Sequence, residues 1–153
     1  MNTIDYFKLQ AKNLYRDFKT KKSYFDEGIH DFLCEYTPKY FDIDSIVCDF
    51  DLNEDNFSLM NAQHVIAKIA GFEKWAELLR ASVSELELAK LLFDNQDIIH
   101  IQTWRDYIAD AEEMNQINFD SFTKLDLYKQ LFLEKRIFED SFPDYLLKKN
   151  RQE

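Results

Sequence analysis

Apolar side chains recur at steps of three and four residues along most of this 153-residue sequence, a spacing that places them on one face of an α-helix. After Thr3, a residue suited to cap a helix, the first such face comprises Ile4, Phe7, Ala11, Leu14 and Phe18. Only two glycines and two prolines occur, and hairpin turns and phosphate loops depend on glycine for positive φ angles. We therefore expect an all-α fold, a bundle of about six or seven helices that forms a single domain over residues 1–153.

Helix boundaries are marked most clearly between residues 58 and 85. Ser58 is a suitable N-cap, Phe57 is placed to pack on the first turn, and Gly71 is placed to end the helix as its C′ residue. A second, short helix is expected over residues 73–81. Residues 82–85, with the sequence Ser-Val-Ser-Glu, form a capping-box pattern that opens a further helix.

The C-terminal part continues the helical pattern. We expect one helix at about 98–115, and another that begins at Asn118 or Asp120 and runs through Phe138. The side chains expected to turn inward from this last helix are Phe122, Leu125, Leu131 and Phe132. Residues 148–153 form a polar tail that we expect to fray.

Residues 23–57 show no clear helical spacing and carry much of the acidic charge. Residues 1–22 hold six bases against two acids, a net charge of +4, whereas residues 23–58 hold one lysine against ten acids, a net charge of −9. We expect short helices after Thr37-Pro38 and around residues 44–50, although residues 46–52 also suit an edge strand. Either the basic helix neutralises the acids within the fold, or the acidic segment 23–57 faces a basic partner.

The second alternative predicts a non-enzymatic domain that binds a basic protein, in an immunity, antitoxin or inhibitor role. General binding of nucleic acid is disfavoured, because the net charge is −10 and phosphate contacts require Lys and Arg. No cofactor and no metal are expected. The candidate partner-binding residues are Asp42, Asp44, Asp49, Asp51, Glu54 and Asp55.

The stretch around Asp49 and Asp51 suggests two kinds of catalytic or metal site. It resembles the first motif of haloacid-dehalogenase-type phosphatases, which implies a Mg²⁺-dependent phosphohydrolase with these two carboxylates at a strand end, but Leu52 stands where that family turns with Gly-Thr. Read as an EF-hand loop, the stretch has Glu54 in place of the glycine at position six and Met60 in place of the final Glu. A solvated acidic segment before a helix fits the residues better.

Residues 66–72 resemble the first helix and turn of a helix-turn-helix, with Ala67 and Gly71 at the expected separation. This predicts, as another alternative, a nucleic-acid-binding regulator that uses residues 58–81 with basic help from residues 8–22. The second helix argues against it, since Glu77 occupies an apolar position and its bases are opposed by acids.

A longer pattern runs from Ala62 to Leu78, with the sequence Ala-Gln-His-Val-Ile-Ala-Lys-Ile-Ala-Gly-Phe-Glu-Lys-Trp-Ala-Glu-Leu, and Leu9–Leu14 gives a matching opening helix. Over residues 8–81 the chain resembles small bacterial helical domains catalogued as glyoxalase-related. The resemblance implies a helical fold and no settled activity. Glyoxalase chemistry itself needs a metal-binding βαβββ scaffold, and the sequence shows no such pattern.

The remaining chemistry-bearing residues give no site. His30, His64 and His100 share no helical face, and Cys34 and Cys48 lack the spacing of a zinc ligand set, so we expect two buried, reduced thiols. Residues 1–18 contain no secretory apolar region, and no apolar run approaches the length of a membrane span. We expect a cytoplasmic protein.

Overall fold

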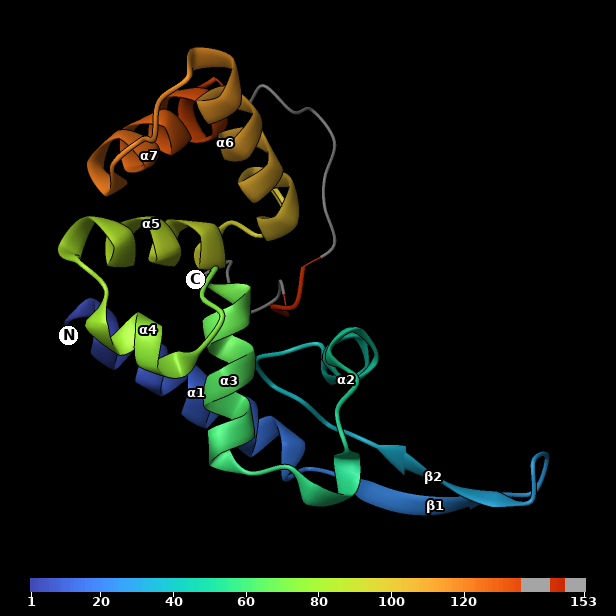
Figure 1. The fold of residues 1–153 in the computed structure, drawn as a ribbon. Helices are drawn as coiled ribbons and strands as arrows, with labels where there is room; N and C mark the ends of the chain where they lie inside the picture. The colour runs from blue at the N-terminus through green and yellow to red at the C-terminus, as the bar shows by residue number, and fades with distance from the viewer. Residues whose placement is uncertain (136–143, 148–153) are drawn as a thin grey trace. The chain divides into compact units, whose positions relative to one another are not determined.

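The computed structural model describes residues 1–135 and 144–147, which Figure 1 shows as a ribbon coloured along the chain. Seven α-helices and one two-stranded sheet contain most of these described residues. In chain order the elements are α1 (Thr3–Phe18), β1 (Lys22–Asp26), β2 (Asp31–Glu35), α2 (Ile43–Phe50), the 3₁₀ turn η1 (Glu54–Asn56), α3 (Leu59–Ile69), α4 (Trp75–Arg80), α5 (Val83–Asp94), α6 (Ile101–Asn115), α7 (Ser121–Leu127) and the π-helical stretch η2 (Tyr128–Glu134).

The fold is mostly helical, as the spacing of apolar residues predicts, but the expectation of a purely all-α fold is wrong. Strands β1 and β2 pair antiparallel, with Lys22 opposite Glu35 and Asp26 opposite Asp31. Neither face of this hairpin is buried. Its sequence therefore lacks the alternation of apolar and polar residues by which a half-buried strand is predicted. Residues 46–52, the segment that also suited an edge strand, instead contain the second half of helix α2.

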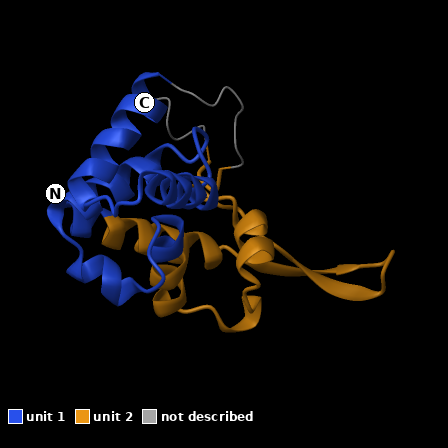
Figure 2. Cartoon of the chain, turned by 45° about the horizontal axis from the view of Figure 1, so that its top comes forward, with its two compact units in different colours: residues 1–6, 66–143 blue, residues 7–65, 144–153 orange. Residues whose placement is uncertain are grey.

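Contacts within the chain group it into two compact units, which Figure 2 shows in different colours. Unit 1 comprises residues 1–6 and 66–143, and unit 2 comprises residues 7–65 and 144–153. The boundary between them falls inside α1 and inside α3. The expectation of a single domain over residues 1–153 stays a prediction.

Unit 1 is built on an aromatic core formed by α5, α6, α7 and η2. The Trp104 ring packs edge-on against Tyr128 and Phe132, with centroid distances of 5.4 and 5.5 Å. Leu125 and Phe132 are buried as expected, and Leu131 is half-buried. The expectation that Phe122 turns inward is wrong, since its side chain is 69% exposed. It lies in the first turn of α7, ahead of the part of the helix that packs on the core.

Local capping signals predict the helix ends well. The Ser58 Oγ accepts the Asn61 backbone N–H at 3.2 Å, and the Ser82 Oγ accepts that of Glu85, also at 3.2 Å. Gly71, with φ 102°, ends α3 in the left-handed conformation, and the Phe72 N–H reaches back to the Ala67 carbonyl at 2.9 Å. Asp120, rather than Asn118, caps α7. The end expected for that last helix, at Phe138, lies outside the described residues.

Unit 2 is organised around a buried carboxylate at the end of α1. Asp17 is 2% exposed, and its two oxygens accept the backbone N–H groups of Lys39, Tyr40 and Phe41 at 3.0, 2.8 and 2.8 Å. This clamp fixes the segment that leads into α2. Residues 145–147 lie alongside the same segment, where the Asp42 N–H donates to the Tyr145 carbonyl at 2.8 Å.

Within residues 1–135 and 144–147, no helix combines the length and the apolar content that a membrane crossing requires.

Candidate functional site

The acidic residues on α2 differ in how far the fold uses them. Asp42 caps the helix, since its carboxylate accepts the Ser45 backbone N–H at 3.3 Å and the Ser45 hydroxyl at 2.8 Å. Asp44 and Asp51 are exposed, and Asp51 ends the helix in the left-handed conformation with φ 49°. Asp42 therefore has a structural role, which its spacing from Ser45 signals in the sequence, whereas Asp44 and Asp51 point charge at solvent.

Asp49 is held by a tyrosine distant in the sequence. The Tyr145 hydroxyl donates to Asp49 Oδ2 at 2.7 Å, and the Tyr145 ring lies 5.6 Å from that of Phe50. Partial burial of the phenol, together with the hydrogen bond to Asp49 and its negative charge, raises the pKa of Tyr145 well above its ordinary value. The hydrogen bond therefore orients one oxygen of the Asp49 carboxylate.

Glu54 and Asp55 surround the root of the hairpin. The Tyr36 hydroxyl donates to Glu54 Oε1 at 3.0 Å, and burial followed by this carboxylate raises the pKa of Tyr36. The Lys21 ammonium donates to the Glu54 backbone carbonyl at 3.0 Å and lies 3.4 Å from the Asp55 carboxylate. Asp55 remains 90% exposed at its side chain, so this ion pair is open to solvent.

The ion pairs show how far neighbouring bases contact the carboxylates of the acidic segment. Within the described residues, Lys21–Asp55 is the only ion pair that involves any of the ten acids in residues 23–58. In the described part of the chain, no base of α1 forms an ion pair with any of these acids. A solvent-exposed pair of this kind contributes about 0–1 kcal/mol.

The same segment contains an exposed amphipathic hairpin. Phe25 faces Phe32 across the strands, with ring centroids 5.3 Å apart, and these side chains are 47% and 68% exposed. Tyr24 and Leu33 form the neighbouring cross-strand pair on the opposite face. This surface was not predicted from the sequence. The signal for it is the pair Tyr24-Phe25 shortly before Gly28 and the pair Phe32-Leu33 shortly after it.

Asp49 and Asp51 lie at the end of a helix, which does not suit the phosphatase or the EF-hand interpretation of these residues. The phosphatase motif needs a strand end and the EF-hand needs a continuous ligand loop, whereas these residues close α2. In the described part of the chain, no three His, Cys, Asp or Glu side chains are grouped so that they can hold a metal ion.

Helices α3 and α4 follow one another in the order that a helix-turn-helix requires. The connecting turn is held by Arg105, whose guanidinium donates to the Gly71 carbonyl at 2.7 Å and lies 3.4 Å from Glu73. Helix α4 has six residues, and both Glu77 and Arg80 are exposed on it. Opposed charges on so short a helix provide little attraction for a phosphate backbone.

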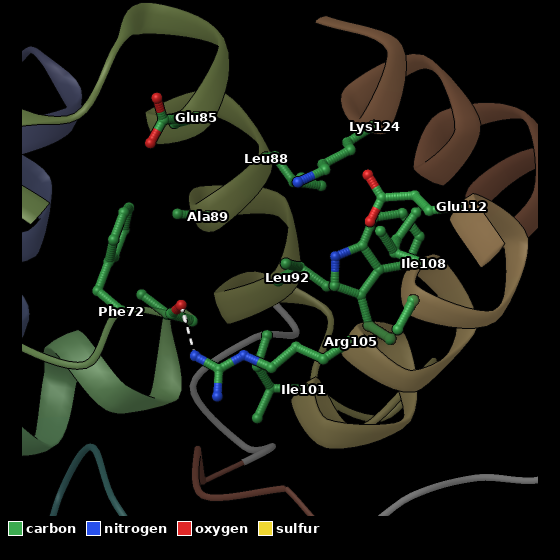
Figure 3. A pocket seen from close by; sticks show the side chains of 14 residues that line it. Phe72, Glu85, Leu88, Ala89, Leu92, Ile101, Arg105, Ile108, Glu112 and Lys124 are labelled. Carbon is green, nitrogen blue, oxygen red and sulfur yellow. Dashed lines mark hydrogen bonds between the residues drawn. The ribbon is translucent and has the colours of Figure 1, made fainter. Parts of the chain in front are cut away.

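Unit 1 contains a cavity of about 330 Å³ between α5 and α6, shown in Figure 3. Its walls are mainly apolar, and Glu85, Arg105, Glu112 and Lys124 lie around them. The Glu112 carboxylate is already used, since it accepts the Phe119 backbone N–H at 2.7 Å. A cavity of this size suits a small apolar group, but its two bases and two acids balance and select no ligand class by charge.

The expectation of two buried thiols is wrong. Cys34 is half-buried in β2 and Cys48 is exposed on α2. Cys34 belongs to a hairpin without a buried face, and Cys48 lies on the side of α2 away from the buried Ile43 and Ile46.

Comparisons of the chain with protein-family models, with curated proteins and with solved structures found no match.

Proposed function

We propose that this chain is a non-enzymatic protein-binding domain whose acidic segment, residues 23–57, receives a basic protein partner. The observation that carries the proposal is the single ion pair that the ten acids of this region form within the described residues. Unpaired carboxylates repel one another, and a basic partner relieves that repulsion while the charges steer its approach. An immunity, antitoxin or inhibitor role fits this chemistry.

Three of the candidate residues can lose their charge while the contacts that they make in the fold are kept. Asp44, Asp49 and Asp51 are exposed on α2, and Asn at position 49 still accepts the Tyr145 hydrogen bond. Asn also tolerates the left-handed conformation of residue 51. Asp42 and Glu54 are less suitable for substitution because they hold Ser45 and Tyr36.

The test compares two triple variants that remove the same charge. The site variant is Asp44→Asn/Asp49→Asn/Asp51→Asn, and the control is Asp110→Asn/Glu113→Gln/Glu134→Gln, which neutralises three exposed acids of unit 1.

Binding of a short labelled peptide of alternating Arg and Ser is measured by fluorescence anisotropy over a salt series. We expect the site variant to bind more weakly than the control, with a difference that shrinks as ionic strength shortens the Debye length to about 10 Å at 0.1 M. Equal binding by the two variants would refute the role of α2. A gel shift of mixed DNA or RNA at low salt would support the nucleic-acid alternative instead.

A further inference from the structure

The hairpin of β1 and β2 is an exposed arm on a fixed root. At the root, the Phe18 ring packs edge-on against Tyr36 with centroids 5.5 Å apart, and Thr20 Oγ1 accepts the Thr37 N–H at 2.9 Å. Lys21 adds its bonds to the Glu54 carbonyl and the Asp55 carboxylate. The root is thereby attached to α1 and to the segment around η1, while both strands remain exposed for most of their length.

The tip of the arm is held by its own turn. Asp26 Oδ1 accepts the N–H groups of Gly28 and Ile29 at 2.8 and 3.3 Å. A Cβ atom at Gly28 would lie 3.0 Å from that oxygen, a tight contact with the end of the Asp26 side chain. His30 completes it in the left-handed conformation, with φ 52°. The sequence therefore specifies this turn locally, although no core covers it.

The pleat gives the arm two faces of different chemistry. One face carries Ser23, Phe25, Phe32 and Cys34 and contains no charged residue. The other face carries Tyr24 and Leu33 together with one base and three acids, and it places Asp26 directly opposite Asp31. Like charges at directly opposed positions destabilise a strand pair, and a cation beside them removes that cost.

Both outer edges of the arm are open within the described residues, since the sheet has two strands only. An isolated hairpin is marginally stable in water, and a third strand adds backbone hydrogen bonds and side-chain contacts. An extended segment also alternates its side chains between two faces. A partner strand that alternates apolar and basic residues therefore matches both faces of the arm at once.

We propose that the arm, residues 22–35, binds an extended segment of a partner protein in which apolar and basic residues alternate, and that this segment adds to the hairpin as a third strand. This rests on the proposed function, for which it names the contact. A second copy of this chain does not fit the edge, because residues 22–35 hold one base against four acids and two such arms repel each other.

The test uses two labelled peptides of equal charge, one alternating Val and Arg, the other alternating Ser and Arg. The wild-type protein is expected to bind the Val/Arg peptide about tenfold more tightly, because Val covers the Phe25–Phe32 face. The variant Phe25→Ser/Phe32→Ser should lose this preference and bind both peptides alike. Phe122→Ser is the matched control, since Phe122 is 69% exposed and Phe32 is 68% exposed; it should keep the preference.

A second variant separates binding from folding of the arm. Asp26→Asn/Asp31→Asn removes the like-charge pair, and Asn retains the oxygen that the turn requires. The arm should be at least as stable, yet affinity for both peptides should fall at low salt. Amide hydrogen exchange should show protection within residues 22–35 when the Val/Arg peptide binds.

Failure of the arm differs from failure of the proposed function. If the wild-type protein binds both peptides equally and the phenylalanine substitutions leave both affinities unchanged, the proposal for the arm is refuted. The acidic segment would then still bind basic peptides. If neither peptide binds at low salt, the proposed function fails as well. If sedimentation shows a dimer that Phe25→Ser/Phe32→Ser abolishes, the occupant is a second copy and the proposal is wrong.

Discussion

Replacing Asp17 with Asn should destabilise unit 2 by about 3 kcal/mol. Asp17 Oδ2 accepts two backbone N–H groups and Oδ1 accepts a third, and a hydrogen bond to a charged group contributes about 1.5–3 kcal/mol. In its better orientation, Asn keeps its oxygen toward Tyr40 and Phe41 and turns its NH₂ toward the Lys39 N–H. The bond from Lys39 is then lost, because its N–H faces the NH₂ donor of Asn. The bonds from Tyr40 and Phe41 remain but are weaker, because their acceptor is no longer charged.

The assay is urea unfolding followed by circular dichroism, with Asp5→Asn as the control. Asp5 lies on the same helix and is exposed, so its substitution should change the free energy of unfolding by no more than about 0.5 kcal/mol. Amide hydrogen exchange gives a local measure, because the N–H groups of Lys39, Tyr40 and Phe41 should lose protection in Asp17→Asn. A loss below about 1 kcal/mol with unchanged protection would show that the carboxylate does not clamp this segment.

The other predictions concern helix ends and a tyrosine. Gln116, with φ 54°, ends α6 in the left-handed conformation, so Gln116→Gly should stabilise by about 1 kcal/mol in thermal unfolding; a lower Tm would contradict this. Gly71→Ala should destabilise by about 1–2 kcal/mol, because φ is 102° and the new Cβ meets Ile101 at 3.1 Å; unchanged stability would refute that strain. Tyr145→Phe should cost about 1 kcal/mol near neutral pH through loss of the Asp49 bond. Because folding raises the pKa of Tyr145, this cost should persist up to about pH 10 and decline above it as the unfolded phenol ionises; a cost that grows there would contradict the assigned direction.

The parts of the fold that follow from the sequence are those set by neighbouring residues. Ser58 and Ser82 bond to groups three residues away, and Gly71 ends α3 through bonds to the preceding turn. Such signals lie within one short window of sequence, and the spacing of apolar residues then gives the helix between them. The seven α-helices of the described residues fall within the number that this spacing predicts.

The parts that do not follow depend on distant contacts or on the absence of burial. The Asp17 clamp spans 22 to 24 residues, and the bond from Tyr145 to Asp49 spans 96; no local pattern marks either. The hairpin was not predicted because a strand is recognised in a sequence by the apolar residues of a buried face, and neither face of this arm is buried. The charge of the six candidate acids follows from the sequence, and the spacing of Asp42 from Ser45 also marks its capping role. No local pattern marks the role of Glu54, whose partner Tyr36 lies 18 residues away.

The contacts that hold the acidic segment in place depend little on ionic strength, so the effect of salt on binding can be measured separately. The hairpin root is attached mainly by ring packing of Phe18 and Tyr36 and by bonds to backbone groups at Thr37 and Glu54, which salt screens weakly. The one ion pair that the described residues form there, Lys21–Asp55, has an exposed carboxylate and contributes about 0–1 kcal/mol. Raising the ionic strength therefore weakens attraction between the segment and a basic partner much more than it weakens the segment itself. A loss of binding in salt consequently reports on the contact between the two proteins rather than on unfolding of the acidic segment.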